Sequence, residues 1–130
     1  KKLSPHIHIG GDEVSTAQWA KSAVAQKVAH DNNVDVSNLE GMMLEKASNH
    51  LHSLHRDAVV WDDALDSAGN LPNGTVVMIW REFLGLDQRG DKAADRGHSV
   101  VLAPSEHAYF DHWQSQRHTQ FDAICCYTPL

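Results

Sequence analysis

The stretch "DAVVWDDAL", from Asp57 to Leu65, decides the predicted fold because a run of apolar residues leads directly into two carboxylates. An apolar run without polar alternation is typical of a strand that is buried on both faces. Two further stretches have the same character, "TVVMIW" over 75–80 and "HSVVLAPS" over 98–105. Upstream, "HIHIG" over 6–10 predicts a shorter strand that ends at a pair of glycines.

Helical segments are predicted between these strands. "STAQWAKSAVAQKVAHD", over 15–31, has helix-compatible apolar spacing, and 38–56 repeats apolar residues at three- and four-residue steps. Ser37 and Glu40 fit a capping box at the start of that second helix. A short polar helix is expected within 85–97, with Gly97 as its C-terminal cap. The segment 119–130 reads either as a final strand or as an extended tail.

The alternation of buried strands and helices predicts an α/β fold with parallel strands and covering helices. Two architectures remain open on this pattern, a doubly wound sheet and a (β/α)8 barrel. At 130 residues, the chain has the length of one domain with a single core.

Composition and charge exclude several classes of partner. The net charge of −6 argues against nucleic acid and anionic membranes, because both require a basic surface. No apolar run is long enough to span a bilayer. We expect no cofactor and no metal, since no Cys/His spacing suggests zinc. The cluster of His50, His52 and His55 reads as a polar helix face, because only the last two share a face.

Polar and aromatic residues follow the end of each predicted strand. They are Asp12 and Glu13, then Trp61 with Asp62 and Asp63, then Trp80 with Arg81 and Glu82, and finally Tyr109 and Asp111. A single Trp at a strand end is more typical of core packing, and an Asp-Glu pair before a helix also suits the helix dipole. Four successive strands that end in this way instead predict a sugar site, since ligands bind at that edge of parallel sheets.

The first predicted strand and the residues after it resemble a known family. "HIGGDEV", His8 to Val14, followed by Trp19, resembles the H-x-G-G-D-E-V…W signature of family 20 glycoside hydrolases, the β-N-acetylhexosaminidases. "VVWDDAL", "VMIWR" and "VVLAPSEHAYFD" are similar to that family's later barrel strands in order and separation. "GGDE" also occurs in diguanylate cyclases, but there a Phe follows and the motif lies on a β-hairpin.

The resemblance implies that residues 1–130 are about half of a (β/α)8 barrel, from approximately its fourth strand to its seventh or eighth. It implies a retaining hydrolase that acts on an N-acetylhexosamine-terminated oligosaccharide or glycoconjugate through the substrate's own acetamido group. Export to the periplasm, the lysosome or the outside of the cell is likewise an implication of the family.

The resemblance also assigns roles to six residues. Glu13 would be the general acid, and Asp12 would bind the acetamido N–H. Tyr109 would hold the acetamido oxygen. Trp61 and Trp80 would form walls of the pocket, and Asp111 would bind sugar hydroxyls.

The residues themselves give a reason for the adjacent carboxylates. An ionised neighbour raises the pKa of a general acid toward neutrality. Neighbouring side chains of a strand point to opposite faces, so both can face one ligand only where the backbone departs from the pleat. Gly10 and Gly11 permit that departure. We expect His8 to brace the strand end from beneath.

The length bears on function, because a complete barrel needs about 250 residues. We therefore expect a partner for the open side of the sheet, either the missing half of the barrel or further copies of this chain. The alternative function is an inactive fragment that acts only as a structural or weak sugar-binding module.

Overall fold

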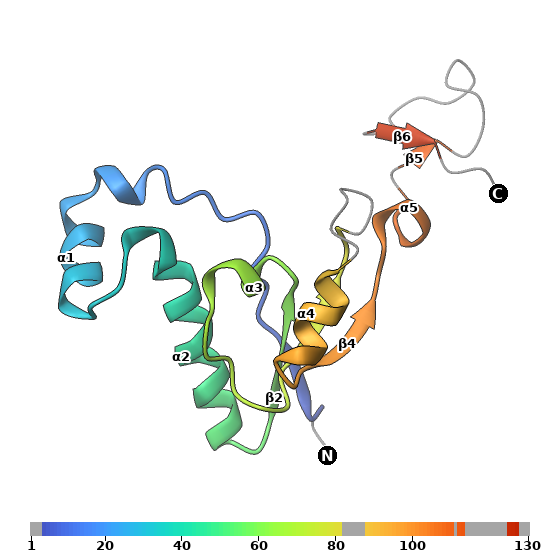
Figure 1. Ribbon diagram of the computed structural model, residues 1–130, viewed down its shortest axis with the longest axis horizontal. Helices are drawn as coiled ribbons and strands as arrows, with labels where there is room; N and C mark the ends of the chain where they lie inside the picture. The colour runs from blue at the N-terminus through green and yellow to red at the C-terminus, as the bar shows by residue number, and fades with distance from the viewer. Residues whose placement is uncertain (1–3, 82–87, 111, 114–124, 128–130) are drawn as a thin grey trace.

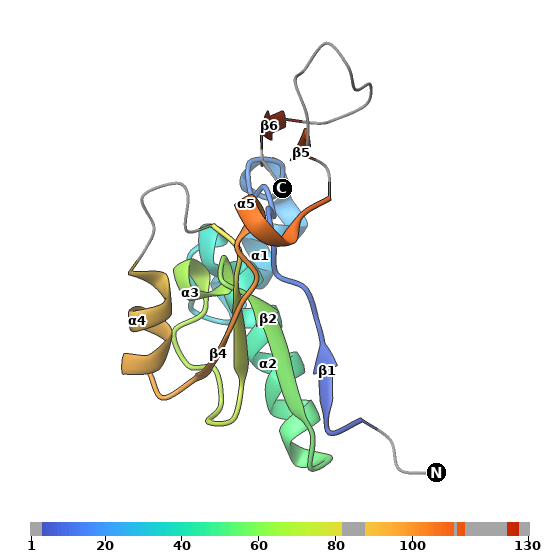
Figure 2. The same ribbon diagram turned by 90° about the vertical axis from the view of Figure 1, so that its right-hand side faces the viewer.

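The computed structural model describes residues 4–81, 88–110, 112–113 and 125–127. Its main sheet contains four parallel strands in the order β1-β2-β3-β4 (Figure 2). These strands are β1 (His6–His8), β2 (Asp57–Trp61), β3 (Val76–Ile79) and β4 (Ser99–Leu102). The predicted α/β class with parallel strands is therefore confirmed. The order follows the chain without the reversal that a doubly wound sheet requires, as expected of a segment of a barrel.

Helices cover one face of this sheet (Figure 1). They are α2 (Leu39–Ser53), α3 (Ala64–Ser67) and α4 (Arg89–Asp95). Alternate residues of the central strands, such as Val60 and Val77, are fully buried beneath them. The core cluster that results consists of Leu44, Val60, Ala64, Leu65, Ala68, Leu71, Val77, Ile79 and Ala93.

The other face of the sheet is open within the described part of the chain. Its residues follow from the register, in which Trp61 pairs with Met78 and Met78 pairs with Val101. Val59, Trp61 and Met78 are half-buried on this face, and Val101 is exposed. Figure 2 looks onto this face, with α2 behind β2. In a closed barrel this face would line the interior.

The boundaries of the two long helices differ from the prediction. The segment 15–31 is interrupted at Ser22, which separates the 3-10 turn η1 (Trp19–Lys21) from α1 (Ala23–Asp31). The Ser22 hydroxyl accepts a hydrogen bond from the Ala25 N–H at 3.3 Å, so it caps a new helix instead of continuing the old one. The second helix ends at Ser53 because His55 has a positive φ of 55°.

The predicted capping box of Ser37 and Glu40 is wrong. A 3-10 turn, η2 (Val36–Asn38), precedes α2, and Asp35 caps that turn. The Asp35 carboxylate accepts hydrogen bonds from both the N–H and the hydroxyl of Ser37, at 2.8 and 2.6 Å. Asn38 therefore becomes the N-cap of α2 and makes no side-chain capping bond.

The C-terminal part contains α5 (Ser105–Ala108) and a second, two-stranded sheet of β5 (His112–Trp113) and β6 (Cys125–Tyr127). Of the two alternatives for 119–130, a strand is present at 125–127, and the rest of that segment lies outside the described residues. Gly97 follows α4 with a φ of 81°, which confirms its predicted capping position. Among the described helices, none combines the length and the apolar character needed to cross a membrane.

Candidate active site at the strand ends

The turn after β1 is built from left-handed backbone. Gly10 and Gly11 have φ values of 78° and 95°, and Glu13 follows with a φ of 52°. The left-handed region is open to glycine at little cost but strains a residue that carries a Cβ. The expected departure from the strand pleat is therefore present. It turns the chain at the point where the two carboxylates begin.

Packing beneath the turn explains why Gly11 has no side chain. A Cβ built on Gly11 would lie 3.0 Å from Cδ1 of Leu44 on α2. His8 braces the turn from the strand side, since its Nδ1 accepts the Gly10 N–H at 3.0 Å. The His8 ring also lies 5.0 Å from the Trp61 ring, centroid to centroid. The expected bracing role of His8 agrees with these contacts.

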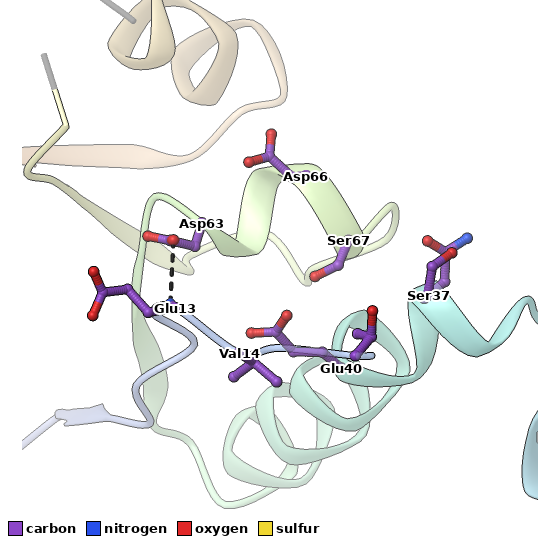
Figure 3. Close-up of a pocket in the computed structure, with 9 residues that line it drawn as sticks. Glu13, Val14, Ser37, Glu40, Asp63, Asp66 and Ser67 are labelled. Carbon is purple, nitrogen blue, oxygen red and sulfur yellow. Dashed lines mark hydrogen bonds between the residues drawn. The ribbon is translucent and has the colours of Figure 1, made fainter. Parts of the chain in front are cut away.

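Asp63 connects the turn to the neighbouring strand ends. Its Oδ1 accepts the Glu13 N–H at 3.3 Å, and its Oδ2 accepts the Trp80 indole N–H at 2.8 Å. Nη1 of Arg81 lies 3.2 Å from the same Oδ1. Figure 3 shows the Glu13 carboxylate directed away from Asp63 while the backbone N–H of Glu13 points at it. One carboxylate thus joins the ends of β1, β2 and β3.

Trp80 continues this chain of contacts toward the fourth strand end. Its ring stacks on the Tyr109 ring with centroids 6.3 Å apart and an interplanar angle of 13°. The Arg81 guanidinium lies 5.8 Å from the centroid of the Trp80 ring, within cation–π range. An indole and a phenol in parallel planes form an aromatic wall of the kind that packs against the C–H face of a sugar.

A buried ion network lies under this wall. Asp62 is fully buried, and its Oδ2 binds Arg81 Nε at 3.0 Å and Arg89 Nε. Its Oδ1 accepts the Trp80 backbone N–H at 3.2 Å. Asp66 lies at the outer side, 2.7 Å from Arg89 Nη2. Burial tends to raise the pKa of Asp66, but the hydrogen bond and charge of Arg89, followed by those of Arg81, lower it overall.

A polar pocket of about 390 Å³ opens beside the turn (Figure 3). It is lined by Glu13, Val14, Thr16, Ser37, Asn38, Glu40, Asp63, Asp66 and Ser67. Burial raises the pKa of Glu40, and the nearby negative charge of Asp63 raises it further. The Ser67 hydroxyl acts in the opposite direction. Among the described residues, no group of three or more acidic, His or Cys side chains could hold a metal ion.

The structure brings together some of the predicted site residues. Glu13, Trp80 and Tyr109 are joined through Asp63 and the aromatic stack. Trp61 lies on the open face of the sheet beside His8, and Asp12 is exposed on the turn. Asp111 lies outside the described residues. The residue roles in substrate binding and proton transfer stay predictions.

Sequence reasoning placed Asp62, Asp63 and Arg81 at strand ends but assigned them no role, and it missed Arg89. A signal was present, because two acids follow β2 and a base follows β3, at the same end of adjacent parallel strands. Opposite charges gathered at one end of a sheet favour an ion pair. Arg89 had no comparable signal, since it comes from a helix 27 positions beyond Asp62.

Comparison with known proteins identifies relatives. The rat β-hexosaminidase subunit beta is 31% identical over 102 residues, which are 75% of this chain and 19% of that protein. A β-hexosaminidase of Vibrio furnissii is 31% identical over 109 residues, 83% of this chain and 17% of the relative. The chain thus spans less than a fifth of the length of these two relatives.

Solved structures of related enzymes also match this chain. An exo-β-N-acetylglucosaminidase of glycoside hydrolase family 20 from Vibrio harveyi, in complex with N-acetylglucosamine, matches with a TM-score of 0.68 and 32% identity over 85% of this chain and 17% of that one. A β-N-acetylhexosaminidase from Bacteroides fragilis matches in fold over 98% of this chain and 25% of its own, with a TM-score of 0.79 and 19% identity.

The fold of this chain is therefore shared with a known group of proteins. The family model for the catalytic domain of glycosyl hydrolase family 20 matches residues 2–129. The chain belongs to glycosyl hydrolase family 20, and it corresponds to part of that family's catalytic domain.

Proposed function

We propose that this chain carries the general acid and an aromatic wall of a β-N-acetylhexosaminidase, which removes terminal N-acetylhexosamine from an oligosaccharide or glycoconjugate. The observation that carries the proposal is the link from Glu13 through Asp63 to Trp80 and Tyr109. It places the residue that carries the acid beside a stacked pair of rings, which can bind a sugar.

The chemistry follows a retaining, substrate-assisted course. Glu13 protonates the glycosidic oxygen while the carbonyl oxygen of the 2-acetamido group attacks the anomeric carbon and the glycosidic bond breaks. The intermediate is a cyclic oxazolinium ion. Asp12 accepts the acetamido N–H and balances the positive charge that develops on that nitrogen. A water molecule then opens the ring as Glu13 takes its proton, which restores the original anomeric configuration.

Four further side chains complete the proposed pocket. Tyr109 donates its hydroxyl to the acetamido oxygen, and Trp61 and Trp80 form walls. Support for an N-acetylhexosamine comes from the Vibrio harveyi neighbour, which was solved in complex with N-acetylglucosamine. Asp111 is proposed to bind sugar hydroxyls on the strength of its sequence position two residues after Tyr109.

A chromogenic N-acetyl-β-glucosaminide tests the proposal. We expect turnover that a thiazoline mimic of the oxazolinium ion inhibits. The substitution Glu13→Gln removes the transferable proton, and we expect it to lower kcat by about 10²- to 10⁴-fold. Undiminished turnover in Glu13→Gln would refute the assigned acid, and insensitivity to the thiazoline would refute the substrate-assisted course.

A second candidate function is that of a non-catalytic structural or weak sugar-binding module. The open face of the sheet favours it, because β1 and β4 are both edge strands and the barrel interior is not enclosed by described residues. Chemical shift changes on addition of N-acetylglucosamine, without turnover of the chromogenic substrate, would support it. Light scattering would then show whether copies of the chain associate to cover the face.

A further inference from the structure

We infer that Asp63 is a positioning residue for the reaction: its carboxylate fixes the backbone of the general acid Glu13 relative to the indole of Trp80. This inference rests on the proposed hydrolase function. It concerns a residue that contacts neither the scissile bond nor the acetamido group in the mechanism above, and that acts through the two residues it holds.

The geometry gives each oxygen of Asp63 a distinct task. Oδ1 accepts the Glu13 N–H at 3.3 Å and lies 3.2 Å from Arg81 Nη1. Oδ2 accepts the Trp80 indole N–H at 2.8 Å. Three donors from two other strand ends thus converge on one carboxylate, which is itself largely buried, with 14% of its side chain exposed.

The backbone at Glu13 needs such a contact. Glu13 has a φ of 52°, in the left-handed region that strains a residue with a Cβ. A strained backbone persists where surrounding contacts determine it. The Asp63 hydrogen bond is a contact of this kind. Because the Glu13 side chain extends away from Asp63 (Figure 3), the direction of its carboxylate follows from the backbone that Asp63 holds.

The contacts of Asp63 require both of its carboxylate oxygens to accept. Both oxygens act as acceptors, and Arg81 lies 3.0 Å from Asp62 as well as 3.2 Å from Asp63. An Asn side chain offers one acceptor oxygen and a donor amide. If the oxygen keeps the indole, the amide faces the Glu13 N–H and Arg81, and the contact with the general acid is lost.

The experiment compares two leaving groups. The dinitrophenolate group of a dinitrophenyl N-acetyl-β-glucosaminide leaves without protonation. The sugar that leaves from diacetylchitobiose must instead be protonated by the acid. We expect Asp63→Asn to lower kcat/KM for the disaccharide about 10- to 100-fold, because a displaced acid transfers its proton poorly. The value of kcat/KM for the dinitrophenyl substrate should change much less, because kcat/KM reports the steps up to departure of the leaving group and excludes the later ring opening, in which Glu13 acts as a base. An equal loss with both substrates would refute the positioning role.

Asp66→Asn is the matched control, since Asp66 also binds Arg81 but contacts neither Glu13 nor Trp80 in the described structure. We expect it to leave the ratio of the two rates unchanged. If Asp63→Asn does not fold, Asp63→Glu keeps the charge that Arg81 faces and shifts the oxygens by one methylene. It should raise the ratio of the dinitrophenyl rate to the disaccharide rate, and an unchanged ratio would refute the inference.

A second readout separates this inference from the proposed function. In ¹H–¹⁵N spectra of the full chain, Asp63→Asn should move the Glu13 amide and the Trp80 indole resonances together, and Asp66→Asn should move neither to the same extent. Lack of turnover in the unsubstituted chain would refute the catalytic proposal, and these spectra would still test the contact. Unmoved Glu13 and Trp80 resonances in Asp63→Asn would overturn the inference itself.

Discussion

The ends of β1 and β2 each present two adjacent carboxylates, in opposite environments. Asp12 and Glu13 are exposed on a left-handed turn, and neither carboxylate has a hydrogen bond or ion pair with another described residue. Asp62 and Asp63 are buried or nearly so, and they bind donors from β1, β3 and α4. The buried pair thus joins the strand ends, whereas ligand binding is the role proposed for the exposed pair.

The largest loss of stability is expected from a substitution in the buried carboxylate pair, Asp62 and Asp63. Asp62→Asn removes the charge that Arg81 and Arg89 share, and it leaves two largely buried guanidinium groups without it. Disruption of one partner in a buried ion pair costs about 3–5 kcal/mol. We therefore expect the free energy of unfolding to fall by that amount. Urea denaturation, followed by Trp fluorescence, would measure it.

Asp12→Asn is the control for this comparison, because it makes the same chemical change at an exposed position. We expect it to alter the free energy of unfolding by less than about 0.5 kcal/mol. Equal destabilisation by the two substitutions would contradict the division between an exposed pair and a structural pair.

An intermediate effect is expected at the turn that exposes the first pair. Gly11→Ala places a Cβ on a backbone with φ of 95° and brings it 3.0 Å from Leu44 Cδ1. The left-handed conformation alone costs about 1–2 kcal/mol for a residue with a Cβ. We expect a lower melting temperature by calorimetry.

Gly69→Ala provides the comparison, since a Cβ there would meet no atom closer than the Glu45 carboxylate at 4.0 Å. Its effect should remain within about 0.5 kcal/mol. If Gly69→Ala destabilised the chain as much as Gly11→Ala, the tight approach of the turn to α2 would not explain the glycine at position 11.

The smallest effect is expected on the pKa of Glu40, which is raised by the charges of Asp63 and Asp12, one residue from each pair. Burial raises its pKa first, and the charge of Asp63 raises it more than that of Asp12. We therefore expect Asp63→Asn to bring the pKa of Glu40 down further than Asp12→Asn does. A carboxyl ¹³C titration by NMR would measure both shifts. A larger effect of Asp12→Asn would reverse the ranking of the two pairs at this site.

The raised pKa of Glu40 also has a consequence for stability. The folded chain binds this proton more tightly than the unfolded chain, so the contribution of Glu40 to stability is fully present below its ordinary pKa of about 4.3. The contribution is lost as the pH rises through the higher folded value. Glu40→Gln should consequently raise the melting temperature at neutral pH but not in acid.

Local patterns were sufficient to predict the sheet. β2, β3 and β4 lie within the three apolar runs identified from the sequence, because continuous Val and Ile are typical of parallel strands. Helix starts were less predictable. Ser37 carries a capping signature, yet Asp35, two positions earlier, binds its hydroxyl and N–H and so replaces that arrangement.

The candidate site was likewise predictable only in part. The turn after β1 could be predicted because a Gly-Gly pair indicates left-handed backbone at a definite place. The role of Asp63 could not, since its partners Glu13 and Trp80 lie 50 positions before it and 17 after it. Hydrogen bonds at such separations depend on the register of parallel strands, which no local periodicity specifies.

The sequence separation between paired strands determines which strand joins the sheet at the greatest cost in conformational entropy. Val59 of β2 pairs with Val76, only 17 positions later, whereas His6 of β1 pairs with Asp57, 51 positions later. Closing a chain segment three times as long costs about 1 kcal/mol more in conformational entropy. The strand that carries the proposed general acid is therefore the one whose attachment the chain's connectivity disfavours most, so the contacts of Asp63 with the turn also serve to retain β1 in the sheet.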